Sequence, residues 1–207
     1  MIFIRYENGK GYVRAYPITT LILLANIIMF IVLMFNGGSM NDETLIRFGA
    51  LTNVGPYASE WWRYVSSLFL HHGFDHLLFN CFALLVFAPP LERLLGSFKY
   101  VLLYLLSGLL GNIVSIAQFN HLGEPTYTVG ASGAIYGVYG AFLYIAFFQR
   151  GMMDEASRKT LYTLLIIGIV YSFVASNINL MAHLGGLIGG FFIYGLLIRI
   201  KKPKKIR

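Results

Sequence analysis

The strongest constraint in this sequence is a set of six apolar stretches, each long enough to cross a lipid bilayer. A hydrocarbon core about 30 Å thick needs roughly 17 to 25 apolar residues in a helix. The chain has 207 residues, of which 57% are hydrophobic and 12% charged, too apolar a balance for an ordinary soluble domain. We therefore expect an all-α, polytopic membrane protein with six transmembrane helices. The predicted spans are residues 17–36, 66–88, 98–117, 131–149, 160–176 and 181–199.

Helix breakers mark the ends of the first two spans. Pro17 suits the first turn of a helix, where its missing N–H costs nothing. A pair of glycines, Gly37 and Gly38, ends the first span. Because proline disrupts a helix interior, Pro89 and Pro90 predict the end of the second span.

Positive charge is divided unevenly between alternate loops. Lysine and arginine collect in cytoplasmic loops. Only Arg47 and Arg63 fall on one side, and the other fourteen basic residues fall on the opposite side. Both termini are therefore expected in the cytoplasm, with residues 1–16 as a short lead, 17–200 as the membrane domain and 201–207 as a basic tail. The fourteen are Arg5, Lys10, Arg14, Arg93, Lys99, Arg150, Arg158, Lys159, Arg199, Lys201, Lys202, Lys204, Lys205 and Arg207.

The longest loop, residues 37–65, is predicted to lie on the outer side. It contains Trp61, Trp62 and Tyr64 around Arg63. Aromatic side chains of this kind favour the headgroup region of a bilayer. We expect the loop to lie at the membrane surface.

Four polar residues occur in the first turns of three predicted spans. With the N-terminus inside, the second, fourth and sixth spans all run from outside to inside. His76 and Asn80 lie in the second span, Ser132 in the fourth and His183 in the sixth. These side chains are therefore expected at one depth, a little below the outer surface.

The four residues form a chemically complete set. A serine hydroxyl becomes a nucleophile only with a base, and His183 can be that base for Ser132. His76 and Asn80 offer hydrogen-bond donors on one helical face, as an oxyanion hole requires. Since no carboxylate lies at this depth in the last three spans, we expect a Ser–His dyad whose imidazole is held by packing on Tyr136.

The motifs around these residues resemble those of the rhomboid family of intramembrane serine proteases. The resemblance covers roughly residues 45–195. It is carried by GASG around Ser132, HxxxxHxxxN as His71, His76 and Asn80, AHLGG around His183, WWR at Trp61 to Arg63, the turn at Glu92 and Gly96, and GxxGN from Gly108 to Asn112.

The resemblance implies a six-helix rhomboid-like bundle that cleaves other proteins' transmembrane segments near the outer membrane surface. It makes Ser132 the nucleophile of an acyl-enzyme, His183 the general base, and His76 and Asn80 the oxyanion donors. Tyr136 would stack on the base. Two roles for His71 stay open, polar packing and the supply of water or substrate. The expected supporting residues are Tyr136, His71, Gly130, Gly133 and Gly186.

Two other functions remain as alternatives: a non-catalytic rhomboid-like binder of client helices, and a proton or solute carrier using the buried histidines. No metal is expected because H-E-x-x-H is absent and no cysteine or carboxylate completes a ligand set, and no cofactor is expected. The predicted partners are single-span membrane proteins and the lipid bilayer, not nucleic acid. A bacterial-type plasma membrane is the expected location, and the oligomeric state is left open.

Overall fold

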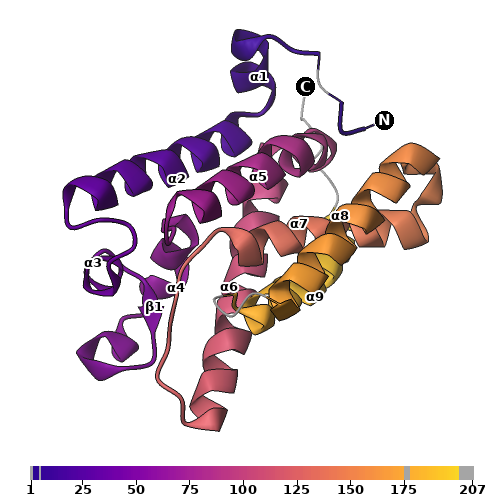
Figure 1. Ribbon diagram of the computed structural model, residues 1–207. Helices are drawn as coiled ribbons and strands as arrows, with labels where there is room; N and C mark the ends of the chain where they lie inside the picture. The colour runs from indigo at the N-terminus through magenta and orange to yellow at the C-terminus, as the bar shows by residue number, and fades with distance from the viewer. Residues whose placement is uncertain (1, 5, 175–177, 201–207) are drawn as a thin grey trace.

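The computed structural model describes residues 2–4, 6–174 and 178–200, and these are mostly helical (Figure 1). The predicted tail, residues 201–207, and the last two residues of the fifth predicted span lie outside the described residues. The long helices are α2 (Pro17–Phe35), α5 (Phe74–Leu95), α6 (Ser97–Leu122), α7 (Ser132–Phe148), α8 (Glu155–Val174) and α9 (Leu180–Leu197). The shorter elements are α1 (Gly9–Ala15), α3 (Asp42–Arg47), β1 (Leu51–Thr52), η1 (Gly55–Ser59), α4 (Arg63–Ser66), η2 (Ser67–Phe69), β2 (Tyr127–Thr128) and η3 (Arg150–Met152).

The described helices have the lengths and compositions of a multi-pass membrane protein. Four of them, α2, α5, α6 and α9, are long and apolar enough to cross a bilayer. Helix α7 is apolar but has only 17 residues. Helix α8 has 20 residues, and its first turns carry Glu155, Arg158 and Lys159. The six long helices therefore match the six predicted spans in order, although only four meet both requirements.

The second predicted span begins later than its hydropathy indicated. Residues 66–69 belong to the short turns α4 and η2, and α5 starts at Phe74. Gly73 separates the two with a φ of 81°, a backbone conformation that favours glycine. His71 therefore lies in the connection that leads into α5, and not within the helix as expected.

The prediction that Pro89 and Pro90 end this helix is wrong, because α5 continues to Leu95. A proline lacks its own N–H and crowds the carbonyl one turn earlier, but its carbonyl can still accept a hydrogen bond from a later residue. The helix ends instead at Gly96, whose φ is 79°.

Glu92, in the last turn of α5, explains why the extra turn is stable. Its carboxylate is 1% exposed and accepts hydrogen bonds from the backbone amides of Ile18 and Thr19 at 2.9 and 2.8 Å. The hydroxyls of Thr19 and Ser97 donate to it at 2.7 and 2.8 Å. A negative charge is favourable at a helix N-terminus. Glu92 therefore fixes the start of α2, which lies alongside α5 (Figure 1).

The predicted cytoplasmic lead, residues 1–16, contributes to the core as well as containing α1. The Phe3 side chain is 8% exposed and packs edge-on against Phe87 and Phe142, with ring centroids 4.8 and 5.3 Å apart. The chain before the first long helix is therefore anchored to α5 and α7.

A two-stranded antiparallel sheet is the one departure from all-α structure among the described residues. Strand β1 pairs with β2 in the register Leu51↔Thr128. The hydroxyl of Tyr127 donates to Asp42 at 2.6 Å. The pKa of Tyr127 is raised to about 12, mainly because the hydroxyl is partly buried and secondly because it donates this hydrogen bond. The sheet joins the long outer loop to the segment that leads into α7.

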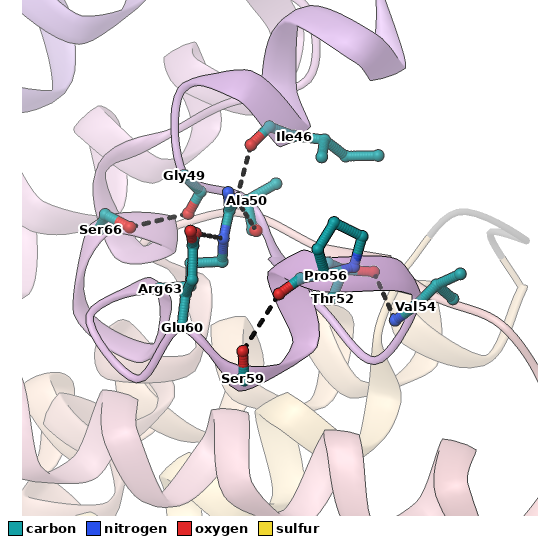
Figure 2. Close-up of polar contacts among 10 residues, drawn as sticks. All are labelled: Ile46, Gly49, Ala50, Thr52, Val54, Pro56, Ser59, Glu60, Arg63 and Ser66. Carbon is teal, nitrogen blue, oxygen red and sulfur yellow. Dashed lines mark hydrogen bonds and ion pairs between the residues drawn. The ribbon is translucent and has the colours of Figure 1, made fainter.

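The long loop of residues 37–65, predicted to lie on the outer side, is folded around the side chain of Arg63, which is 2% exposed (Figure 2). Its Nε donates to the Glu60 carboxylate at 2.7 Å, and its Nη1 donates to the carbonyls of Ile46 and Ala50. The guanidinium also lies 4.5 Å from the ring centroid of Tyr57. A residue expected only among surface aromatics is therefore the internal anchor of this loop.

Glycines bring α9 into backbone contact with α7. A Cβ added at Gly186 would lie 2.0 Å from the carbonyl oxygen of Gly133, and one at Gly190 would lie 2.0 Å from that of Gly137. No side chain larger than hydrogen fits at such distances, which is how small residues let membrane helices pack closely. Gly133 and Gly186, named from the sequence as supporting residues, thus lie at the closest approach of the two helices.

Replacing Gly186 with alanine is predicted to separate α7 from α9. Because the new methyl would meet backbone and not a flexible side chain, we expect a loss of about 3 kcal/mol, typical of severe overpacking. The thermal unfolding midpoint of the detergent-solubilised protein measures it. Gly151→Ala is the control, since no atom lies within 4 Å of its added Cβ. Equal midpoints for the two variants would contradict the prediction.

Arg63→Ala is predicted to loosen the loop of residues 37–65, since it removes the hydrogen bonds to the Ile46 and Ala50 carbonyls and to Glu60. A loss of roughly 2 kcal/mol is expected, which corresponds to a midpoint lowered by about 5 °C. Arg47→Ala is the matched control, because Arg47 is exposed in the same loop. If both variants unfold at the wild-type temperature, Arg63 is not the anchor of the loop.

Candidate active site

Ser132 and His183 are in hydrogen-bond contact. The Oγ atom of Ser132 lies 2.9 Å from Nε2 of His183. Ser132 is the first residue of α7, and His183 lies in the first turn of α9. The structure therefore brings together the hydroxyl and the imidazole that the sequence placed on two different spans.

The position of Ser132 depends on the turn before α7. Gly130 has a φ of 123°, which side-chain-bearing residues rarely adopt. Its N–H donates to the Ser67 carbonyl at 2.8 Å, which ties this turn to η2. Helix α7 begins directly afterwards, so the Ser132 hydroxyl lies at a helix N-terminus, where the first backbone N–H groups have no partner within the helix.

The position of His183 depends on the cap of α9. The side-chain oxygen of Asn179 accepts from the N–H of Ala182 at 3.0 Å, an N-cap bond. The amide nitrogen of Asn179 donates to the hydroxyls of Ser115 on α6 and Thr128 on β2. These bonds fix the start of α9 against two neighbouring elements, one turn before the imidazole.

Two side chains hold the imidazole of His183, which is 7% exposed. The Tyr136 ring stacks on it, with centroids 4.1 Å apart and planes inclined by 11°. Its Nδ1 lies 2.8 Å from the hydroxyl oxygen of Ser172 on α8. Ser172 donates to the Gly168 carbonyl at 2.7 Å, and its oxygen lies 3.3 Å from the Tyr136 hydroxyl.

His76 packs against the turn that precedes Ser132. A Cβ added at Gly130 would be 2.7 Å from Cε1 and Nε2 of His76 and 3.6 Å from the Ser132 Oγ. The absence of a side chain at Gly130 therefore lets the His76 ring lie against this turn. Its imidazole and the Ser132 hydroxyl both lie close to Gly130.

Asn80 lies one helical turn after His76 in α5 and is 6% exposed. Its amide nitrogen makes no hydrogen bond within the described part of the chain. A buried hydrogen-bond donor that has no acceptor costs free energy. The Asn80 amide is therefore free to donate to an acceptor that a ligand brings.

His71 is fully buried and packs edge-on against His76, with ring centroids 5.1 Å apart. It precedes α5 and belongs to the wall behind His76.

Sequence reasoning missed the contribution of Ser172. The sequence indicated that packing alone holds the imidazole, because no carboxylate lies at its depth in the last three spans. The signal is present all the same: Ser172 is the only serine in residues 164–174 of an otherwise apolar helix, four residues after Gly168. A hydroxyl inside an apolar span marks a polar contact, but only the helix packing shows which contact.

This arrangement has the parts for acyl transfer. It combines a hydroxyl, an imidazole that can take its proton, and nearby donors for a developing negative charge. Within the described residues, no three His, Cys, Asp or Glu side chains gather as ligands for a metal.

Comparison with known proteins adds a family. Residues 58–200, more than half of the chain, match the model of the Rhomboid domain. The chain is 38% identical over 207 residues to YdcA of Bacillus subtilis (strain 168), covering 98% of this chain and all of that protein. It is 40% identical over 187 residues to the rhomboid protease GluP of the same organism, covering 90% of this chain and 35% of GluP. It is 31% identical over 209 residues to the rhomboid protease AarA of Providencia stuartii, covering 91% of this chain and 74% of AarA.

The chain thus spans the whole of one relative and about a third of another. The family match begins in the outer loop and includes every residue of the site described above. With 38 to 40% identity over nearly the full length of this chain, the similarity is not confined to short motifs. The chain belongs to the rhomboid family.

Proposed function

We propose that this protein is an intramembrane serine endopeptidase that cleaves transmembrane segments of other membrane proteins near the outer membrane surface. The enzyme class, a serine protease of rhomboid type, follows from the family. The observation that carries the residue assignment is the 2.9 Å contact between Ser132 Oγ and His183 Nε2. That distance allows direct proton transfer from the hydroxyl to the imidazole.

The proposed reaction has two stages. In the first, His183 Nε2 takes the Ser132 proton while Oγ attacks the scissile carbonyl carbon. The tetrahedral intermediate collapses when the imidazolium gives that proton to the leaving amine, and an ester to Ser132 remains. In the second, His183 takes a proton from water, whose oxygen attacks the ester, and the proton returns to Ser132 as the acid leaves.

The negative oxygen of each tetrahedral intermediate needs donors, and we assign this role to His76 and Asn80. The support is the position of the His76 ring against Gly130, close to the Ser132 hydroxyl, and the buried amide of Asn80, which has no hydrogen-bond partner among the described residues. A well-placed donor of this kind is worth about 3 to 4 kcal/mol in the transition state. The Tyr136 ring, stacked on His183, holds the orientation of the imidazole, and His71 packs against His76.

The proposed topology gives this site its depth. Six spans with both termini in the cytoplasm make α5, α7 and α9 run inward from the outer surface, so the site residues share one level. The proposed substrates are single-span proteins of a bacterial-type plasma membrane. Their helices must unwind locally, because a carbonyl in a helix is already hydrogen-bonded.

A non-catalytic binder and a solute carrier are the competing functions. A binder has no use for an imidazole that contacts a helix-terminal serine, and a carrier would be expected to have a carboxylate relay within the membrane. The site geometry favours neither alternative.

Ser132→Ala is predicted to abolish cleavage of a model single-span substrate, by about 10⁴-fold or more, because no other group forms the acyl-enzyme. Product formation in proteoliposomes measures the loss. Ser59→Ala is the control, since that serine lies exposed in the outer loop and bonds only the Pro56 carbonyl among the described residues. Wild-type cleavage by a folded Ser132→Ala protein would refute the proposal.

A fluorophosphonate probe is predicted to label Ser132 in the wild-type protein and to leave Ser132→Ala unlabelled. The reason is that only a serine activated by a base reacts readily with such a probe. Mass spectrometry of the labelled peptide identifies the site. A folded wild-type protein that stays unlabelled would favour the non-catalytic binder.

The rate of cleavage is predicted to rise with pH and then level off. Only the neutral imidazole can take the Ser132 proton, so activity appears as His183 loses its own proton. Initial rates between about pH 4 and pH 8 measure this, the interval in which histidines in proteins commonly titrate. A rate that is constant over the whole interval would contradict the assignment of His183 as the base.

A further inference from the structure

We propose that Ser172 is a positioning residue that sets the tautomer of the catalytic base, so that Ser132, His183 and Ser172 form one hydrogen-bonded unit built from three helices. The inference rests on the proposed function. It concerns a residue of α8, whereas the nucleophile and base lie on α7 and α9.

The Ser172 hydroxyl has a single proton to donate. That oxygen lies 2.7 Å from the Gly168 carbonyl oxygen, which can only accept. The Ser172 proton is therefore committed to Gly168. Toward Nδ1 of His183, 2.8 Å away, Ser172 can then only accept.

The contact at Nδ1 determines whether the other ring nitrogen, Nε2, carries a proton. If Nδ1 donates to Ser172, Nδ1 carries the proton of the neutral imidazole. Nε2 then holds a lone pair, and it is Nε2 that lies 2.9 Å from Ser132 Oγ. The opposite tautomer would present an N–H to Ser132 and could not remove its proton.

The contact between Ser172 and Nδ1 also stabilises the imidazolium that forms during the reaction. When the imidazole accepts the Ser132 proton, the Nδ1–H···O bond to Ser172 becomes charge-assisted and stronger. The Tyr136 hydroxyl, 3.3 Å from the Ser172 oxygen, can donate to its remaining lone pair. A Cβ at Gly168 would lie 2.7 Å from that tyrosine hydroxyl, so the glycine leaves it room.

The location of Ser172 couples the base to a third helix. In the described part of the chain, the hydrogen bonds that link α8 to α7 and α9 both involve Ser172. The orientation of the imidazole therefore depends on where α8 lies. A displacement of α8 would break the Nδ1 contact without moving Ser132 or His183.

A purely local role for Ser172 is the competing explanation, because helical serines and threonines often bond the carbonyl one turn earlier. The chain supplies a matched control in the same helix. The Thr160 hydroxyl donates to the Ala156 carbonyl at 3.0 Å and is partly exposed near the start of α8. Thr160→Ala removes the same type of hydrogen bond, from a side-chain hydroxyl to the carbonyl one turn earlier, at a position where the hydroxyl does not contact an imidazole.

The kinetic test compares Ser172→Ala, Ser172→Thr and Thr160→Ala on a model single-span substrate in proteoliposomes. We expect Ser172→Ala to lower kcat between about 10-fold and 100-fold with KM within roughly twofold, the range for a lost hydrogen bond to a charged group. Ser172→Thr, which keeps the hydroxyl, should recover most of the rate, and Thr160→Ala should match the wild type. A wild-type kcat for Ser172→Ala would overturn the inference.

A second test does not depend on turnover. In ¹⁵N-histidine-labelled protein in detergent micelles, the ring signals of His183, assigned by their loss in His183→Gln, should show the proton on Nδ1. Ser172→Ala should give a mixture of tautomers. A wild-type proton on Nε2 would overturn the inference, even if Ser172→Ala failed to fold.

The two proposals fail separately. Cleavage by Ser132→Ala would remove the proposed function. Loss of cleavage in Ser132→Ala together with wild-type kcat and an unchanged tautomer in Ser172→Ala would remove only the role of Ser172.

Discussion

The close approach of α7 and α9 is the constraint on which the rest of the structure depends. Backbone atoms of Gly186 and Gly133 are so near that only hydrogen fits between them. That spacing lets a short serine hydroxyl reach an imidazole on the neighbouring helix without help from a longer side chain. The glycines therefore determine the distance between Ser132 and His183, although they take no part in the chemistry.

Buried polar groups in this protein fall into two kinds. Glu92 at the end of α5 and Arg63 in the outer loop make several hydrogen bonds each, and they hold neighbouring segments together. Asn80, in contrast, has a buried donor that no described residue accepts. A satisfied polar group stabilises the fold, whereas an unsatisfied donor close to the Ser132 and His183 pair suits a ligand.

The sequence predicted most of the helices because apolar length and breakers are local signals. It failed at Pro89 and Pro90, where Glu92 supports an extra turn through contacts with the distant residues Ile18 and Thr19. It also extended the second span over residues that form separate turns. In both places hydropathy describes the local sequence, but the path of the backbone depends on contacts with residues far along the chain.

By itself, the sequence determined that this is a multi-pass helical protein of the rhomboid family, and it indicated Ser132, His183, His76 and Asn80 as one group at one depth. Apolar length and charge asymmetry suffice for the helical membrane fold and the motifs for the family, since all of these can be read along the chain without knowing its packing. Only the tertiary structure decided which hydroxyl faces Nδ1 of His183 and how Arg63 anchors the loop. Such contacts join separate helices, and their geometry depends on the rotation and spacing of those helices, which no local pattern specifies.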